Sequence, residues 1–249
     1  TTVHSDYRLD YLGRPFHRLT YGTINTVALR VFDYHIGVSD AMVQLLISRG
    51  FDPQKLFSIY NGVDFPPKPA KLSRAEYLGS LGITFDADTV VFGIAARLNP
   101  VKDIATLIRG FAGACRTCPN IRLIIAGDGE ERQMLEELAR EMCPEGSVIF
   151  AGWVKDTDSF YNAIDVNMLT SLSEGSPYAL VEGARMRCAT IATSVGGIPY
   201  MMESGVTGLL FTPRDVDTLT AYMVRLVQNP AFRKQLGQNF YEKAERVYS

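Results

Sequence analysis

Cysteine and histidine are scarce in this sequence, with four and three residues respectively among 249. Cys115 and Cys118 form a C-x-x-C pair, but a structural zinc site needs a second pair of ligands at similar spacing. None of the histidines lies near this pair in the sequence. We therefore expect free thiols in or beside the core rather than a metal site, and a reducing cytoplasm suits them.

An excess of charge of either sign is also absent. The 25 basic and 27 acidic side chains give a net charge of −2, which does not indicate a nucleic-acid-binding protein or a polybasic membrane binder. Long apolar runs are missing too. The longest, from Val90 to Ala96, ends at Arg97, well short of the roughly 18 residues of a membrane span.

The start of the chain shows no signal peptide. It begins at Thr1 without an initiator methionine, so we expect a fragment or a processed chain.

What the sequence does contain is an ordinary globular composition, 47% hydrophobic and 21% charged. From Asp88 onward, short apolar segments typical of buried parallel strands alternate with amphipathic helical segments. The expected strands are 89–95, 121–126, 147–150, 166–170, 190–193 and 208–211. The expected helices are 103–115, 130–142, 159–163, 178–186, 216–228 and one from about 230. This alternation predicts an α/β fold with a doubly wound, Rossmann-like parallel sheet.

Residues 1–66 have a different organisation and resemble the end of a preceding, incomplete α/β domain. The pattern predicts a strand over 33–38, a helix over 40–48 with Ser39 as its N-cap, and a strand over 56–60. The proline-rich stretch 65–69 is the best linker candidate. We therefore expect a second, larger domain over 67–249.

Two cations follow the first strand of the larger domain. Arg97 and Lys102 flank a turn that leads into a helix, and a helix N-terminus offers free N–H groups and partial positive charge. Because Arg can clamp phosphate oxygens with two hydrogen bonds, this segment could bind a diphosphate. The alternative is a pair of solvated surface cations.

Two carboxylates follow the strand expected at 166–170. Glu174 lies in the loop, Gly175 and Ser176 permit close backbone approach, and Pro177 suits the first position of the next helix. Glu182 is then about one turn inside that helix. Carboxylate oxygens accept hydrogen bonds from sugar or ribose hydroxyls. The alternative is one acid interacting with the helix dipole and one solvated glutamate.

In order and spacing, these motifs and Asn61–Asp64 resemble retaining glycosyltransferases of the GT-B fold, family 4 (glycosyl transferase group 1), mostly their C-terminal donor-binding domain. The match extends from about residue 31 to the C-terminus. Further supporting segments are 126–130, 150–154, 194–199 and 205–211.

The resemblance implies roles for individual residues. Arg97 and Lys102 would hold the donor diphosphate and stabilise the charge of the leaving group. Glu174 would lie by the donor sugar, and Glu182 would bind the ribose hydroxyls. His4 resembles a first-domain histidine that faces the donor sugar, although a structural histidine is the alternative. The other implied donor-binding residues are Gly127, Val154 (near the base), Gly175, Ser176, Pro177 and Tyr178.

The implied reaction moves a sugar from a nucleotide-diphosphate sugar, with UDP favoured, to a saccharide or lipid-linked acceptor. Anomeric configuration would be retained, with no metal or other cofactor and no nucleic acid. The setting would be polysaccharide or glycoconjugate biosynthesis in the cytoplasm, with peripheral membrane contact through a missing N-terminal domain. A final crossover helix would be truncated. The alternatives are a binding module without activity and a GT-B sugar-nucleotide epimerase.

Two further motifs have simpler explanations. Asp156 and Asp158 match the D-x-D of metal-dependent glycosyltransferases of another fold, but an aspartate just before a helix is a common N-cap. Gly127 and Gly129 follow a strand, yet Arg132 occupies the position of the last glycine in a dinucleotide fingerprint. A hydride-transfer enzyme is therefore disfavoured.

Overall fold

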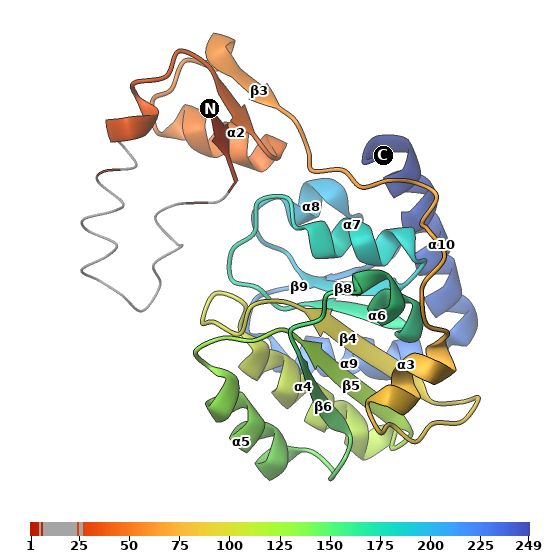
Figure 1. Ribbon diagram of the computed structural model, residues 1–249. Coiled ribbons are helices and arrows are strands. Elements are labelled where there is room, and N and C mark those ends of the chain that lie inside the picture. Colours follow the sequence, from red (N-terminus) through yellow and green to blue (C-terminus); the bar gives the residue numbers. More distant parts are fainter. Residues whose placement is uncertain (5, 7–23, 25–26) are drawn as a thin grey trace.

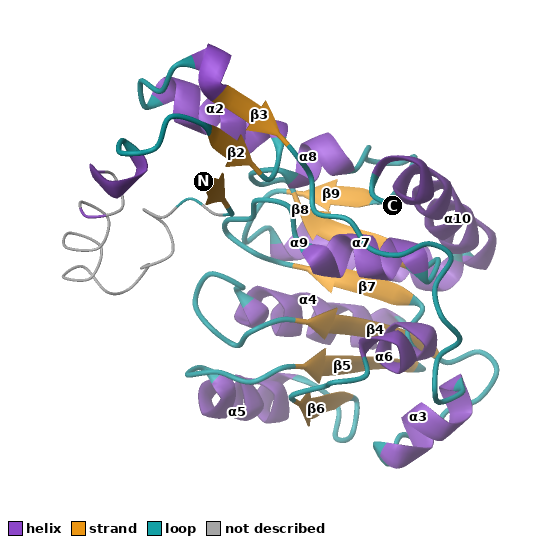
Figure 2. Cartoon of the chain, turned by 45° about the horizontal axis from the view of Figure 1, so that its top comes forward, coloured by secondary structure: helices purple, strands orange, loops and turns teal. Residues whose placement is uncertain are grey.

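The computed structural model describes residues 1–4, 6, 24 and 27–249 and contains two parallel sheets. The small sheet has the order β1-β2-β3 and is formed by β1 (Thr2–Val3), β2 (His35–Gly37) and β3 (Leu56–Ser58). The large sheet has six strands in the order β6-β5-β4-β7-β8-β9. The two sheets are separate bodies of the fold, each with its own helices (Figures 1 and 2).

The large sheet reverses its direction of growth between β4 and β7. Its strands are β4 (Val90–Ala95), β5 (Ile121–Ala126), β6 (Val148–Gly152), β7 (Val166–Leu169), β8 (Ala189–Thr193) and β9 (Leu209–Phe211). The chain adds β5 and β6 on one side of β4, then returns to β4 and adds β7, β8 and β9 on the other side. The predicted doubly wound parallel sheet is therefore confirmed.

Helices cover both faces of this sheet. Figure 1 shows α4, α5 and α9 on one face, and Figure 2 shows α6 and α7 on the other. The helices are α2 (Asp40–Ser48), α3 (Arg74–Ser80), α4 (Ile104–Thr117), α5 (Arg132–Met142), α6 (Thr157–Ala163), α7 (Tyr178–Arg185), α8 (Ile198–Met201), α9 (Val216–Gln228) and α10 (Pro230–Val247). None of the helices in the described part is long and apolar enough to cross a bilayer.

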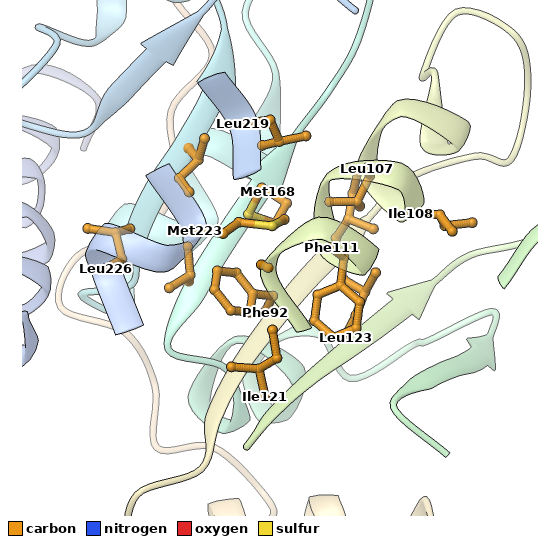
Figure 3. Packing of buried hydrophobic residues seen from close by; sticks show 14 of the residues in the cluster. Phe92, Leu107, Ile108, Phe111, Ile121, Leu123, Met168, Leu219, Met223 and Leu226 are labelled. Carbon is orange, nitrogen blue, oxygen red and sulfur yellow. The ribbon is translucent and has the colours of Figure 1, made fainter. Parts of the chain in front are cut away.

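The core explains why β4 is apolar throughout. Phe92 faces α4 and α9, where it meets Phe111 edge-to-face with ring centroids 6.1 Å apart (Figure 3). Val91, the preceding residue, packs on the opposite face with Phe160 of α6. All four side chains are fully buried. A strand covered on both faces needs apolar residues at consecutive positions rather than alternate ones.

The N-terminal part also follows the predicted pattern. The hydroxyl of Ser39 accepts a hydrogen bond from the N–H of Met42 at 3.3 Å, so Ser39 is the N-cap of α2 as expected. The chain between β3 and α3 then passes beside the C-terminal end of α10. There the N–H of Val63 donates to the carbonyl oxygen of Tyr248 at 2.9 Å.

Helix α3 was not predicted, although the sequence contains a signal for it. The N–H of Ser73 donates to the carboxylate of Glu76 at 2.8 Å, and the N–H of Glu76 donates back to the hydroxyl of Ser73 at 3.3 Å. This is a capping box, whose S-x-x-E pattern can be recognised in a sequence. It fixes the start of the helix that packs against α6.

Candidate functional site

The carboxyl ends of β4 and β7 border a cavity of about 410 Å³. It lies at the reversal point of the sheet order, which is where open α/β sheets bind their ligands. Predicted site residues on its wall are Arg97, Lys102, Gly127, Val154, Glu174, Pro177, Tyr178 and Glu182. Helix α7 begins beside it, with Pro177 as the N-cap and Tyr178 as the first helical residue.

Lys102 and Glu174 form an ion pair in this cavity. The ammonium nitrogen of Lys102 lies 2.6 Å from Oε1 of Glu174, and the side chains are 26% and 10% exposed. The loops that carry them are tied together as well. The N–H of Leu172 donates to the carbonyl oxygen of Val101 at 2.7 Å, and the hydroxyl of Thr170 donates to the carbonyl oxygen of Lys102 at 2.9 Å. Hydrogen bonds between the two loops therefore fix the backbone on both sides of the ion pair.

Arg97 is exposed at the edge of the cavity, just beyond β4. Gly127 lies beside it at the end of β5, with a φ of 138°. A Cβ at Gly127 would overlap the carbonyl oxygen of Ala96. The N–H of Gly127 donates to the carbonyl oxygen of Gly152 at 2.7 Å. Glycine is therefore required for the loops after β4, β5 and β6 to approach each other at this point.

Glu182 is half-buried in the wall formed by α7. Burial raises the pKa of its carboxyl group, while the charge of Arg185 acts in the opposite direction. Arg185 is itself ion-paired with Asp158. Tyr161 is fully buried, and its pKa is raised by that burial and by the charge of Glu182. The carboxylate of Glu182 is therefore partly shielded from water, although the residue lines the cavity.

Both aspartates of the D-x-D motif have structural partners. Asp156 is the N-cap of α6 and accepts hydrogen bonds from the N–H and hydroxyl of Ser159 at 3.3 and 2.7 Å. Asp158 pairs with Arg185. Among the described residues, no three His, Cys, Asp or Glu side chains are grouped so that they could hold a metal ion.

The four cysteines are free thiols. Cys115 lies in the last turn of α4 and Cys118 is the C-cap of that helix. Burial raises the pKa of the Cys115 thiol to about 12, so it stays protonated at neutral pH.

Three predicted residues lie beside the cavity rather than on its wall. Ser176 is buried, and its hydroxyl and carbonyl oxygen accept hydrogen bonds from the backbone and side-chain amide of Asn61 at 3.3 and 2.6 Å. Gly175 packs against the backbone carbonyl of His4, which follows β1. The side chain of His4 is exposed and is not part of the wall. The small sheet thus touches the loop that carries Glu174.

Gly196 and Gly197, which the sequence marks only as part of the supporting segment 194–199, hold the backbone of Glu174. The N–H of Gly197 donates to the carbonyl oxygen of Glu174 at 3.1 Å. Gly196 has a φ of 51°, and a Cβ there would overlap the same carbonyl oxygen. Glycine therefore lets this loop lie against the Glu174 backbone.

Two residues on the cavity wall were also missed as site residues. Ser171 is the second residue after β7, and its hydroxyl donates to Glu174. Trp153 is 75% exposed next to Val154. The available signal for Ser171 was its position just after a strand. For Trp153 the sequence offers no such signal, because the exposure of this large aromatic side chain is visible only in the structure.

The chain is similar to a known family of proteins. Residues 83–243 match the family described as glycosyl transferases group 1. The chain belongs to this family. Its membership confirms the predicted resemblance at this level, while family 4 and retained configuration stay predictions.

Among curated members of the glycosyltransferase family, the lipopolysaccharide core biosynthesis glycosyltransferase LpsE of Rhizobium meliloti is 30% identical over 156 residues, 63% of this chain and 45% of its own. The lipopolysaccharide 1,6-galactosyltransferase of Salmonella typhimurium is 26% identical, and the match covers 78% of this chain and 52% of that protein. The D-inositol 3-phosphate glycosyltransferase of Thermobifida fusca is 26% identical, and the match covers 80% of this chain and 48% of that protein. The chain spans about half the length of these relatives.

Solved structures show the same fold. Sucrose-phosphate synthase from Thermosynechococcus elongatus superposes with a TM-score of 0.82 at 23% identity, covering 100% of this chain and 63% of its own. Anabaena HepE, solved in complex with UDP and glucose, gives a TM-score of 0.78 at 24% identity, covering 87% and 59%. The fold of this family member is therefore that of GT-B glycosyltransferases, as predicted.

Proposed function

We propose that this chain contributes the donor site of a retaining glycosyltransferase. The enzyme transfers a sugar from a nucleotide-diphosphate sugar, with UDP as the favoured nucleotide, to a saccharide or lipid-linked acceptor. One observation carries the proposal: a paired Lys102 and Glu174 share the cavity at the sheet reversal with Arg97 and Glu182. This combination offers cations for a diphosphate and carboxylates for hydroxyl groups.

The diphosphate lies between Arg97 and Lys102 in this proposal. Lys102 has three N–H donors and uses one on Glu174, so donors remain for phosphate oxygens. As the bond between sugar and phosphate breaks, negative charge grows on the departing diphosphate. Two fixed cations stabilise that charge, and we propose that they do so without a metal ion or other cofactor.

The nucleoside and the sugar lie on either side of the diphosphate. Glu182 accepts hydrogen bonds from the ribose hydroxyls, and the backbone of Val154 lies near the base. Glu174 lies beside the donor sugar, where the backbone of Gly175 also contributes. His4 sits against that loop through its backbone, and we propose that its side chain faces the sugar in the complete cleft.

Relatives named for lipopolysaccharide synthesis support an acceptor of saccharide or lipid-linked type. We propose that the reaction belongs to polysaccharide or glycoconjugate biosynthesis. A lipid-linked acceptor would place it in the cytoplasm at the inner face of a membrane. The complex of Anabaena HepE with UDP and glucose supports UDP as the nucleotide.

Calorimetric titration of the chain with UDP, GDP and ADP tests the donor site. We expect selective binding of UDP, weakened in the Glu182→Ala variant and unchanged by a chelator. Release of UDP from a UDP-sugar only when an acceptor is present distinguishes a transferase from a binding module and from an epimerase. Failure of all three diphosphates to bind would contradict the proposal for this chain.

A further inference from the structure

The hydroxyl of Ser171 is a second hydrogen-bond donor to Glu174. Its oxygen lies 2.6 Å from Oε1 of Glu174, the same oxygen that accepts from Lys102 at 2.6 Å. Ser171 is buried, and it forms part of the cavity wall. Each carboxylate oxygen has two lone pairs, so these two donors fill the accepting capacity of Oε1.

The second carboxylate oxygen of Glu174 is differently placed. Within the described residues Oε2 makes no hydrogen bond, although Glu174 lies on the cavity wall. A hydroxyl group of a bound ligand therefore has one carboxylate oxygen available to it. Which oxygen that is depends on the rotation of the carboxylate group.

The main chain around Glu174 is already fixed. The carbonyl oxygen of Ser171 accepts from the hydroxyl of Thr193 in β8 at 2.6 Å. The carbonyl oxygen of Glu174 accepts from the N–H of Gly197 at 3.1 Å. The remaining freedom lies in the side-chain torsions of Glu174, and the hydroxyl of Ser171 restricts them.

We propose that Ser171 is a positioning residue that holds Glu174 ready for the donor sugar. The inference rests on the proposed function, because that function places the sugar beside Glu174. Lys102 cannot hold Glu174 alone, since its ammonium group has a flexible stem and phosphate oxygens compete for it. When a diphosphate draws Lys102 away, Ser171 remains as the donor that keeps Oε1 occupied and Oε2 towards the sugar.

The Ser171→Ala variant distinguishes an effect on binding of the donor sugar from an effect on binding of the nucleotide. Calorimetry with UDP should give an affinity within about twofold of wild type, whereas affinity for UDP-glucose should fall by about tenfold, as expected for losing one oriented hydrogen bond to a charged group. Ser173→Ala makes the same chemical change in the same loop, outside the cavity wall, and should alter neither affinity.

A double-mutant cycle shows whether Ser171 acts through Glu174. In a Glu174→Ala background, Ser171→Ala should have no further effect on UDP-glucose affinity. Equal effects in both backgrounds would overturn the inference, because a general disturbance of the loop does not depend on the carboxylate. If the alanine variant does not fold, Ser171→Thr and Ser171→Val give a pair of similar shape that differs in the hydroxyl.

The two proposals fail in different ways. If the wild-type chain binds neither UDP nor UDP-glucose, the proposed function is contradicted and the role of Ser171 falls with it. If the wild type binds both and Ser171→Ala keeps the ratio of the two affinities, the role of Ser171 alone is overturned.

Discussion

Lys102 and Glu174 are 72 positions apart in the sequence, yet their charged groups lie 2.6 Å from each other. Each is carried by the loop that follows one of the two strands flanking the sheet reversal, β4 and β7. The pair therefore spans the site where such sheets bind ligands. A diphosphate entering the cavity meets a cation that is already oriented by a carboxylate.

The first prediction concerns the charge of Lys102. In Lys102→Met the cation is lost, and the carboxylate of Glu174 remains on the cavity wall without its partner. Both changes oppose an anionic ligand, so we expect the dissociation constant for UDP to rise by about 10- to 100-fold, as for a hydrogen bond to a charged group. Calorimetry measures it. Lys234→Met removes an exposed lysine from α10 and should change nothing; equal affinity in all three proteins would contradict the role of Lys102.

Much of the fold could be predicted because its signals are local. The strand at 121–126 and the helices at 40–48 and 216–228 have the bounds expected from their apolar periodicity. Arg97, Lys102, Gly127 and Glu174 line one cavity because each follows a strand, and the carboxyl ends of parallel strands meet at one edge of a sheet. Helix α3 was missed although its capping box is local.

The contacts that shape the site could not be predicted, because they are tertiary. That Gly196 must be glycine follows from the carbonyl oxygen of Glu174, which lies in another loop. That Ser171 rather than Ser173 reaches Glu174 depends on the rotation of two side chains. The exposed orientation of His4 likewise depends on how the small sheet meets the loop at Gly175.

The second prediction concerns Glu182, whose pKa is raised by burial above the ordinary 4.5. A raised pKa means that the folded chain binds this proton more tightly than the unfolded chain does. The resulting stabilisation is full at low pH and is lost as pH rises through the raised pKa. Glu182→Gln is neutral at every pH, so at pH 7 it should unfold a few degrees above wild type. At about pH 4, near the unfolded pKa, the difference should vanish.

The same variant should bind UDP more weakly, because an amide has one acceptor oxygen where the carboxylate has two. Affinity for inorganic pyrophosphate should stay unchanged, since Glu182 is assigned to the ribose. Glu141→Gln, at an exposed position near the end of α5, is the control for both measurements. A lower unfolding temperature for Glu182→Gln at pH 7 would contradict a raised pKa at this position.

The third prediction compares two glycines. Gly127→Ala should destabilise the chain by at least about 2 kcal/mol, because a residue with a side chain is strained at a φ of 138° and its methyl group overlaps the Ala96 carbonyl. Gly79 lies in α3 with open space around it, so Gly79→Ala should stabilise by about 0.5–1 kcal/mol. Chemical denaturation measures both. A Gly127→Ala variant as stable as wild type would mean that the loops can separate without loss.

The fourth prediction uses Trp153, the one tryptophan of the sequence. It is 75% exposed on the cavity wall beside Val154, where we propose that the base lies. If the base stacks on this ring, UDP should quench its emission and shift it to the blue, whereas pyrophosphate should leave it unchanged. Trp153→Phe keeps an aromatic face and should retain affinity for UDP.

Trp153→Ala should weaken UDP binding by about 1–3 kcal/mol, the usual contribution of a base stacked on an aromatic side chain. Its affinity for pyrophosphate should match wild type, because we propose that the diphosphate lies at Lys102 and Arg97. Emission that stays constant while calorimetry shows UDP bound would place the base away from Trp153. In that case the nucleoside would have to lie elsewhere along the wall, and the assignment of Val154 would fail together with that of Trp153.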